Sequence, residues 1–302
     1  MSDYPAHSKL IAIAVQSGVP AFWEGPPGVG KTSIFYALAK KLDVPCVVQI
    51  GSIMEPSDFG FPVPEGQYIV RKPLKWVEEL RDTNGILVFD ELPHAAPAVQ
   101  AGMLRVIFEG VVGDTPLGPN VKRAAIGNPV DMVGGWDMNP ALANRFCRVK
   151  WDMTGYHKVW LKGMIEGWND LDVPVLPEGW QTRIPHWKAV IGAFAAEIAP
   201  HTLLNFPEAK SQQTEAWPSP RMWENGAVIM AAAEPFGVDA QFQLLAGCVG
   251  EGAAGEFITF YKNADLPEPE KLLLDPNLFP KTKAGQEYII YAILTGTMSV
   301  LY

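Results

Sequence analysis

The segment that most constrains the fold of this chain is an eight-residue run in which a glycine-rich turn ends in Lys-Thr. It matches the phosphate-loop pattern G-x-x-x-x-G-K-[ST], with a strand-like stretch before it and a helix-like stretch after it. Glycines let the backbone N–H groups point inward, and the following helix start adds positive potential. In this pattern Lys31 reaches the β- and γ-phosphates, and the Thr32 hydroxyl ligates Mg²⁺. The predicted phosphate site comprises Gly25, Pro26, Pro27, Gly28, Val29, Gly30, Lys31 and Thr32.

Two adjacent carboxylates follow a continuous apolar run in the first half of the chain. Ile86–Phe89 reads as a buried parallel strand, and Asp90 and Glu91 come directly after it. Ligands of open α/β sheets lie at the carboxyl ends of the strands. We therefore expect Asp90 to hold Mg²⁺ through water and Glu91 to polarise the attacking water as a general base.

The alternation of strand-like and helix-like segments in the first half indicates parallel βαβ units. The fold class predicted is α/β, an αβα sandwich of the P-loop NTPase type with a five-stranded parallel sheet over residues 1–151. An insert with a hairpin is expected near residues 52–72. Helical spacing replaces strand runs after that point, so residues 152–302 are expected to form an all-helical domain with a C-terminal extension. The expected strands are Ala21–Glu24, Cys46–Ile50, Ile86–Phe89, Val121–Ile126 and Phe146–Trp151, and residues 203–218 and 263–284 are expected to be loops.

Charge and motif content exclude several functional classes. The formal net charge is −9, so a basic nucleic-acid footprint and attraction to an anionic membrane are both disfavoured. No apolar run reaches the roughly 18 to 20 residues of a membrane span, so a cytoplasmic location is expected. The chain has no H-E-x-x-H, C-x-x-C or G-x-S-x-G motif, and the absence of N-K-x-D favours ATP over GTP. The uncharged tail after Tyr288 reads as a buried terminal element or a partner-binding tail.

At this point the chain resembles AAA+ ATPases, and within that class the MoxR family. The family carries a D-E-x-x-x-A-P-P-x-x-Q block, a sensor 1 strand that ends in N-P, an L-D-R-F motif, a sensor 2 motif in the helical lid and an insert at helix 2. The similar segments here, spread over residues 8–235, are Asp90–Gln100, Ala124–Pro129, Leu142–Phe146, Ser219–Arg221 and Glu55–Gly60 with the hairpin after it.

The resemblance implies roles for three further residues. Asn128 would orient water against the γ-phosphate. Arg145 would be an arginine finger that reaches the nucleotide of the neighbouring subunit, and Arg221 would contact the γ-phosphate of its own subunit. Arg148 and Arg123 lie nearby as competitors for the finger role. The family also implies ATP and Mg²⁺ as ligands, a sheet order of 5-1-4-3-2, and a homo-oligomeric ring, most often a hexamer.

Two positions depart from the family pattern. Asn144 stands where the family has aspartate, which would weaken the orientation of Arg145. His94 stands where relatives often have arginine, and it reads as a loop histidine or a pH-sensitive contact. Residues 236–302 receive no function from the sequence.

The function expected from the resemblance is that of a remodelling chaperone or activase. Such a protein acts on a protein client, together with a partner that contains a von Willebrand factor A domain. The alternatives are a nucleic-acid-associated or defence-system AAA+ motor, and a nucleotide-gated scaffold that does not hydrolyse ATP. The small basic cluster of Arg71, Lys72 and Lys75 would touch an acidic partner or nucleic acid, or form a solvated face.

Overall fold

The protein is represented by a computed structural model that divides into two compact units. The first contains Met1–Leu142 and Arg148–Val175, and the second contains Ala143–Cys147 and Leu176–Tyr302. The structure describes residues 6–129, 132, 134–136, 138, 140–151, 156–166, 173–198, 200–263, 275, 277 and 281. Among these residues, no helix has the length and apolar character needed to cross a membrane.

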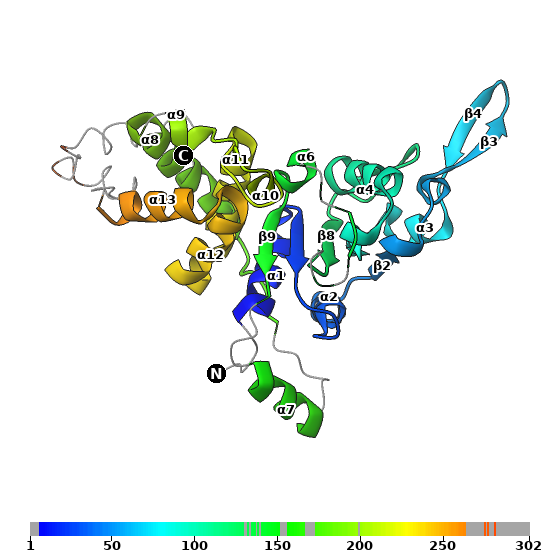
Figure 1. The fold of residues 1–302 in the computed structure, drawn as a ribbon, viewed down its shortest axis with the longest axis horizontal. Coiled ribbons are helices and arrows are strands. Elements are labelled where there is room, and N and C mark those ends of the chain that lie inside the picture. Colours follow the sequence, from blue (N-terminus) through cyan, green and yellow to red (C-terminus); the bar gives the residue numbers. More distant parts are fainter. Residues whose placement is uncertain are drawn as a thin grey trace. The chain divides into compact units, whose positions relative to one another are not determined.

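The first unit, drawn in Figure 1, contains most of the strands and the phosphate-loop segment. Its helices are α1 (Ala6–Ser17), α2 (Lys31–Leu42), α3 (Lys75–Arg81), α4 (Pro97–Glu109) and α7 (Tyr156–Glu166), and α6 (Pro140–Ala143) ends at its boundary. Its strands are β1 (Ala21–Glu24), β2 (Cys46–Ile50), β3 (Phe61–Glu65), β4 (Tyr68–Lys72), β5 (Ile86–Asp90), β6 (Val111–Val112), β7 (Thr115–Pro116), β8 (Lys122–Gly127) and β9 (Cys147–Lys150). Short 3-10 turns are η1 (Gly51–Ile53), η2 (Pro56–Phe59) and η3 (Leu92–His94).

Five strands form one sheet in the order β2-β5-β8-β1-β9. In chain order these are the second, third, fourth, first and fifth strands of the sheet, so the expected order 5-1-4-3-2 is confirmed, read from the other edge. The pairing is parallel, with Ile86 of β5 opposite both Cys46 of β2 and Lys122 of β8. The first four residues of β5 are buried, as expected for a central parallel strand, and only Asp90 is partly exposed.

Helices cover both faces of this sheet, as the handedness of the crossovers requires. The step from β1 to β2 runs toward one edge, whereas the steps from β2 to β5 to β8 and on to β9 run toward the other. Because crossover connections between parallel strands are right-handed, α2 covers one face and α3, α4 and α6 cover the opposite face. Helix α1 packs against α2, β1 and β8 and so belongs to the α2 layer. The predicted αβα sandwich is confirmed.

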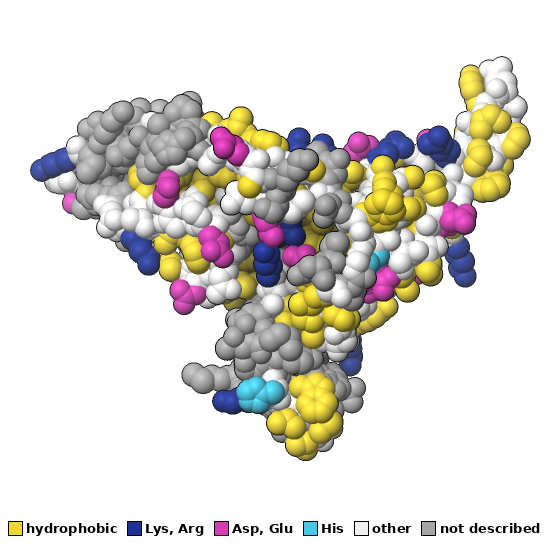
Figure 2. Space-filling view, in the orientation of Figure 1, with side chains coloured by type: hydrophobic (Ala, Val, Ile, Leu, Met, Phe, Trp, Pro, Cys, Tyr) yellow, Lys and Arg dark blue, Asp and Glu magenta, His cyan; other side chains and the backbone are white. Residues whose placement is uncertain are grey.

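A two-stranded hairpin, β3–β4, extends from the first unit between β2 and α3 (Figure 1). Its strands are antiparallel, with Phe61 opposite Lys72 and Glu65 opposite Tyr68. Its base is held by the backbone N–H of Arg71, which donates to Asp114 Oδ2 at 2.8 Å. Three of its large side chains are mostly exposed (Phe61 58%, Tyr68 66%, Ile69 68%), and Figure 2 shows apolar side chains gathered along this arm.

The second unit is helical in its described part. Its helices are α8 (Ile184–Ile198), α9 (Pro200–Leu203), α10 (Lys210–Gln213), α11 (Pro220–Ala233), α12 (Val238–Val249) and α13 (Glu251–Asn263), with 3-10 turns η4 (Trp180–Arg183) and η5 (Glu234–Phe236). Helix α11 packs against α8 and α12, and α13 packs against α12. An aromatic cluster of Phe194, Trp223 and Phe257 forms the core, with ring centroids 5.3 to 5.8 Å apart.

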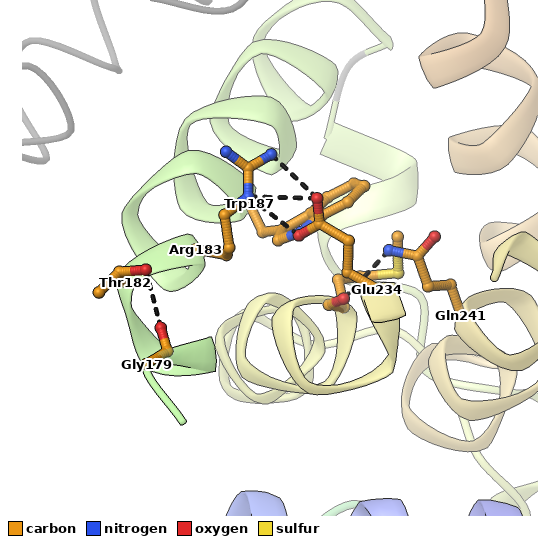
Figure 3. Close-up of polar contacts among 7 residues, drawn as sticks. Gly179, Thr182, Arg183, Trp187, Glu234 and Gln241 are labelled. Atoms are coloured by element: carbon orange, nitrogen blue, oxygen red, sulfur yellow. Dashed lines mark hydrogen bonds and ion pairs between the residues drawn. The ribbon is translucent and has the colours of Figure 1, made fainter. Parts of the chain in front are cut away.

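A polar clamp joins the start of α8 to the end of α11 (Figure 3). The guanidinium of Arg183 donates from Nε to both carboxylate oxygens of Glu234 at 3.1 Å, and the Trp187 indole N–H donates to Glu234 Oε2 at 2.9 Å. Burial works to raise the pKa of Glu234, but the hydrogen bonds from Arg183 and Trp187 and the charge of Arg183 outweigh it. The pKa of this carboxyl therefore lies below its ordinary value.

Two details of the second half differ from the sequence expectation. The stretch 203–218, expected to be a loop, contains the short helix α10. Helix α13 lies in the stretch to which the sequence assigned no particular helix; Gly252 and Gly255 interrupt its pattern, and Ala254, Phe257 and Ile258 make a buried face on it. The expected loop 263–284 and the uncharged tail lie almost entirely outside the described residues.

Candidate active site

The phosphate-loop segment connects β1 to α2 at the carboxyl end of the sheet. Gly30 takes the N-cap position of α2 with φ +87°, a left-handed conformation that favours glycine. The loop begins at Gly25, whose N–H donates to the Gly127 carbonyl of β8 at 3.2 Å. Gly25 also lies against Trp151, so a Cβ added there would come within 2.5 Å of the Trp151 Cβ. The loop is therefore fixed at its start by two neighbouring strands.

Lys31 is almost fully buried, with only 8% of its surface exposed. Its Nζ donates to the carbonyl oxygens of Gly25 and Pro26 and to Asn128 Oδ1, each at 2.8 Å. Burial lowers the pKa of the Lys31 ammonium, and the nearby Asp90 carboxylate opposes this shift. These contacts bring the phosphate loop and the end of β8 together around one ammonium group.

Asp90 and Thr32 meet at the junction of β5 and α2. The Thr32 hydroxyl donates to Asp90 Oδ2 at 3.0 Å, and the backbone N–H of Glu91 donates to Asp90 Oδ1 at 2.8 Å. A hydroxyl and a carboxylate in contact form the kind of oxygen donor set that Mg²⁺ prefers. The residues present therefore fit the ion that the sequence predicts for this position.

Glu91 adopts a left-handed backbone conformation (φ 57°, ψ 35°), which is uncommon for a residue other than glycine. Its Oε2 accepts a hydrogen bond from the hydroxyl of Ser52, in η1 just after β2. Sequence reasoning missed Ser52, which is 39 residues from Glu91. The sheet order could have revealed Ser52, because Ile50 pairs with Asp90 and the segments after β2 and β5 leave the sheet side by side.

Asn128 comes directly after β8, which pairs with β5 (Phe89 opposite Ala125). Its amide lies against Lys31, so the structure groups Lys31, Thr32, Asp90 and Asn128 in one place. His94 lies in η3, three residues after Glu91. Among the described residues, neither of the two buried ring nitrogens of His94 has a hydrogen-bond partner.

The arginines expected to act on nucleotide are held in the second unit. Arg145 is half-buried between α6 and β9, and Arg221 is exposed at the second residue of α11. Arg148, a competitor for the finger role, belongs to the first unit and is buried there. It pairs with Glu24 at 3.1 Å and lies 5.3 Å from the centre of the Phe22 ring. These contacts hold the Arg148 guanidinium inside the first unit.

Comparisons with known proteins agree with this geometry. Residues 20–146 match the family model of the AAA domain (dynein-related subfamily). A search of curated protein sequences finds no match.

Two solved structures are distantly similar. A candidate ATPase from Cytophaga hutchinsonii is 17% identical with a TM-score of 0.49, over 80% of this chain and 79% of that one. A full-length MCM homologue from Methanopyrus kandleri is 16% identical with a TM-score of 0.41, over 85% of this chain and 56% of that one. Residues 20–146 are thus similar to a dynein-related AAA domain, the sheet order and the phosphate loop are those of the P-loop fold, and the chain is an ATPase.

Proposed function

We propose that this chain is a ring-forming AAA+ ATPase of the MoxR type that uses ATP hydrolysis to remodel a protein client. The observation that carries the proposal is the cluster in which Lys31 contacts Asn128 while Thr32 contacts Asp90. It groups a cation for the phosphates, an oxygen pair for a metal ion and an amide for water at the end of one sheet.

The chemistry proposed is in-line attack of water on the γ-phosphorus, with cleavage of its bond to the β,γ-bridging oxygen. Lys31 exchanges its loop carbonyls for phosphate oxygens and stabilises their charge, while Asn128 orients the water. Glu91 leaves the Ser52 hydroxyl to accept the proton that the water gives up. Thr32 and Asp90 would hold Mg²⁺, which neutralises charge on the β- and γ-phosphates.

The proposed active form is a homo-oligomeric ring, most simply a hexamer. Arg145 supplies the finger to the nucleotide of the neighbouring subunit, and Arg221 contacts the γ-phosphate of its own subunit. Arg148, the competing candidate for the finger, is held in an ion pair with Glu24, which supports Arg145 in this role. A guanidinium suits the task because it is planar and permanently charged.

The β3–β4 hairpin is the surface proposed to contact the client. Its exposed Phe61, Tyr68 and Ile69 form an apolar strip on an arm of a chain with net charge −9, which favours a protein ligand over nucleic acid. A partner with a von Willebrand factor A domain, by resemblance to the MoxR family, would bring the client to the ring.

Subunit mixing tests the ring and the shared site. Lys31→Ala loses ATP binding, and Arg145→Ala binds ATP but turns it over at only a small residual rate, so neither protein alone approaches wild-type turnover. Their mixture regains part of the wild-type turnover, because some interfaces pair an intact phosphate loop with an intact finger. Two differently tagged preparations of Lys31→Ala, mixed in the same way, are the control. Inactive mixtures whose tags show subunit exchange would contradict the assignment of Arg145.

Stimulation of turnover separates the candidate partners. The proposal expects wild-type turnover to be unchanged by single-stranded DNA, double-stranded DNA or RNA. The alternative, a nucleic-acid motor, expects a several-fold rise that falls with added salt. A chain that binds ATP tightly as a ring and never turns it over would instead be a nucleotide-gated scaffold.

A further inference from the structure

The five-residue segment that carries Arg145 belongs to the second unit, although helix α6 before it and strand β9 after it belong mainly to the first. Four of its residues are buried: Ala143, Asn144, Phe146 and Cys147. Arg145 is the half-buried exception. Contacts on both sides of Arg145 therefore set where its guanidinium can go.

Asn144 uses both ends of its side-chain amide. Its Nδ2 donates to the Trp217 carbonyl at 2.7 Å, and its Oδ1 accepts from the Ser219 hydroxyl at 2.6 Å. Only 6% of Asn144 is exposed, so water does not compete freely for these bonds. An aspartate here would keep the acceptor but would place a carboxylate oxygen against the Trp217 carbonyl oxygen. The amide is thus matched to this position in a way that the family's aspartate is not.

Ser219 links this amide to the helix that carries Arg221. It is the N-cap of α11, and its Oγ also accepts from the backbone N–H of Met222 at 3.3 Å. Arg221 is the second residue of that helix. A single serine oxygen therefore contacts both the Arg145 segment and the first turn of α11.

The surrounding contacts hold the two partners of Asn144 in place. The Trp217 ring packs edge-on against Phe206 with centroids 5.2 Å apart, and the Asn205 N–H donates to the Pro218 carbonyl at 3.2 Å. At the other end of the segment, Cys147 Sγ donates to the Leu244 carbonyl of α12 at 3.4 Å. Because α12 packs on α11, the segment is tied at both ends to one helical layer.

We propose that Asn144 is a positioning residue that couples Arg145 to Arg221, so that the two arginines of one subunit move together as one rigid element. The proposal rests on the roles given to these arginines under the proposed function. In a ring, Arg145 serves the neighbouring nucleotide and Arg221 serves its own. The link through Asn144 and Ser219 would therefore pass the state of one nucleotide site to the next.

The first test is Asn144→Asp in the full-length chain, measured by steady-state ATP turnover and by binding of a fluorescent ATP analogue. We expect kcat to fall by about tenfold or more, because small displacements of a positioned group cost this much. The KM for ATP should change little, since the phosphate loop is untouched. Gln243→Glu is the matched control: it makes the same amide-to-carboxylate change at an exposed side chain of the same unit, and should leave kcat unchanged.

A double-mutant cycle separates coupling from simple destabilisation. If Asn144 acts through the arginines, Asn144→Asp lowers kcat no further in an Arg145→Ala background, and its effect shrinks in an Arg221→Ala background. A merely structural role would lower kcat by the same factor in every background, and that result would overturn the proposal. Should Asn144→Asp fail to fold, Ser219→Gly removes the same hydroxyl donor at little cost to the helix cap and enters the same cycle.

The same variants show which idea has failed. If Arg145→Ala and Arg221→Ala both keep wild-type kcat, the proposed roles of the arginines are wrong. If both arginine variants have a lowered kcat while Asn144→Asp keeps the wild-type kcat, the proposed roles of the arginines are supported and the coupling through Asn144 is refuted.

Discussion

At the scale of single residues, the site depends on a few polar groups that are already in contact with one another. Glu91 has a left-handed backbone conformation, and its carboxylate accepts a hydrogen bond from Ser52. A carboxylate in this position can accept a proton from the attacking water once it leaves the Ser52 hydroxyl. Its proposed role is therefore separable from nucleotide binding, which depends on Lys31 and the loop.

We predict that Glu91→Gln keeps ATP binding and loses turnover by a factor of about 10² to 10⁴, the usual contribution of a general base. The glutamine keeps an oxygen to accept from Ser52 but cannot take a proton at neutral pH. Turnover is measured by phosphate release and binding by a fluorescent analogue. Glu79→Gln, an exposed change on α3, is the control and should match the wild type. Wild-type turnover in Glu91→Gln would remove Glu91 from the mechanism.

The sequence predicted the residues of this cluster that belong to recognisable local patterns. Lys31, Thr32 and Asp90 follow from the loop pattern and an apolar strand end, and Asn128 follows from the resemblance to the family's sensor 1 strand end. Ser52 was missed because its contact with Glu91 follows from strand order and not from any local spacing in the sequence. The partners of Asn144 were also hidden, since Ser219 lies 75 residues away.

At the scale of elements, helices and strands could be predicted where one face of the segment is apolar or where a turn rich in glycine or proline bounds it. Strands β1 and β2 have the bounds expected from the sequence. The sequence pattern does not mark helix α13, because its glycines lower helix propensity. Packing of Phe257 and Ile258 in the folded protein stabilises this helix. Glycine is required by close packing in the phosphate loop, at Gly25, but lowers stability in helix α13, at Gly255. Substituting each glycine tests this difference.

We predict that Gly25→Ala destabilises the chain and weakens ATP binding, whereas Gly255→Ala stabilises it by about 0.5 to 1 kcal/mol. An added Cβ at Gly25 would lie 2.5 Å from the Trp151 Cβ, which cannot swing aside, so the loop or β9 must shift. At Gly255 an added Cβ meets nothing within 4 Å. Urea unfolding and analogue binding report both effects. Equal stability changes in the two variants would contradict this account of the loop.

The clamp between α8 and α11 gives a prediction about pH. Because the folded-state pKa of Glu234 is lowered, its contribution to stability is full above the ordinary glutamate pKa and disappears as pH falls through the lower folded value. Glu234→Gln should cost about 1 kcal/mol at pH 7, allowing for the partial exposure of the pair, and less at pH 3.5. Unfolding curves at both pH values measure this. Glu224→Gln, at an exposed pair with Lys188, should show neither effect.

At the scale of the whole molecule, the proposed role of Arg145 requires that subunits meet. A single chain carries the phosphate loop and Arg145, but the proposal uses Arg145 on a neighbour's nucleotide. Assembly should then depend on bound ATP, because the negative γ-phosphate attracts the guanidinium of the neighbouring subunit. The mass of the particle in solution reports this directly.

We predict that Glu91→Gln assembles into a ring-sized particle when ATP and Mg²⁺ are added, and dissociates when they are removed. Light scattering after size exclusion measures the mass of each state. Lys31→Ala, which cannot bind ATP, serves as the control and should keep the same smaller mass in both conditions. A Glu91→Gln protein that binds ATP and stays monomeric would mean that a different protein completes the site.

The path of the chain between its two units limits how it can be divided for experiments. The chain passes from the first unit to the second at residue 143, returns at 148 and passes over again at 176. A fragment that ends near residue 151 would carry Asn144 and Phe146 away from the helices that bury them, exposing an aromatic side chain and an unpaired amide. Separating the two units by truncation would break contacts inside the second unit. Experiments on this protein should therefore use the full-length chain.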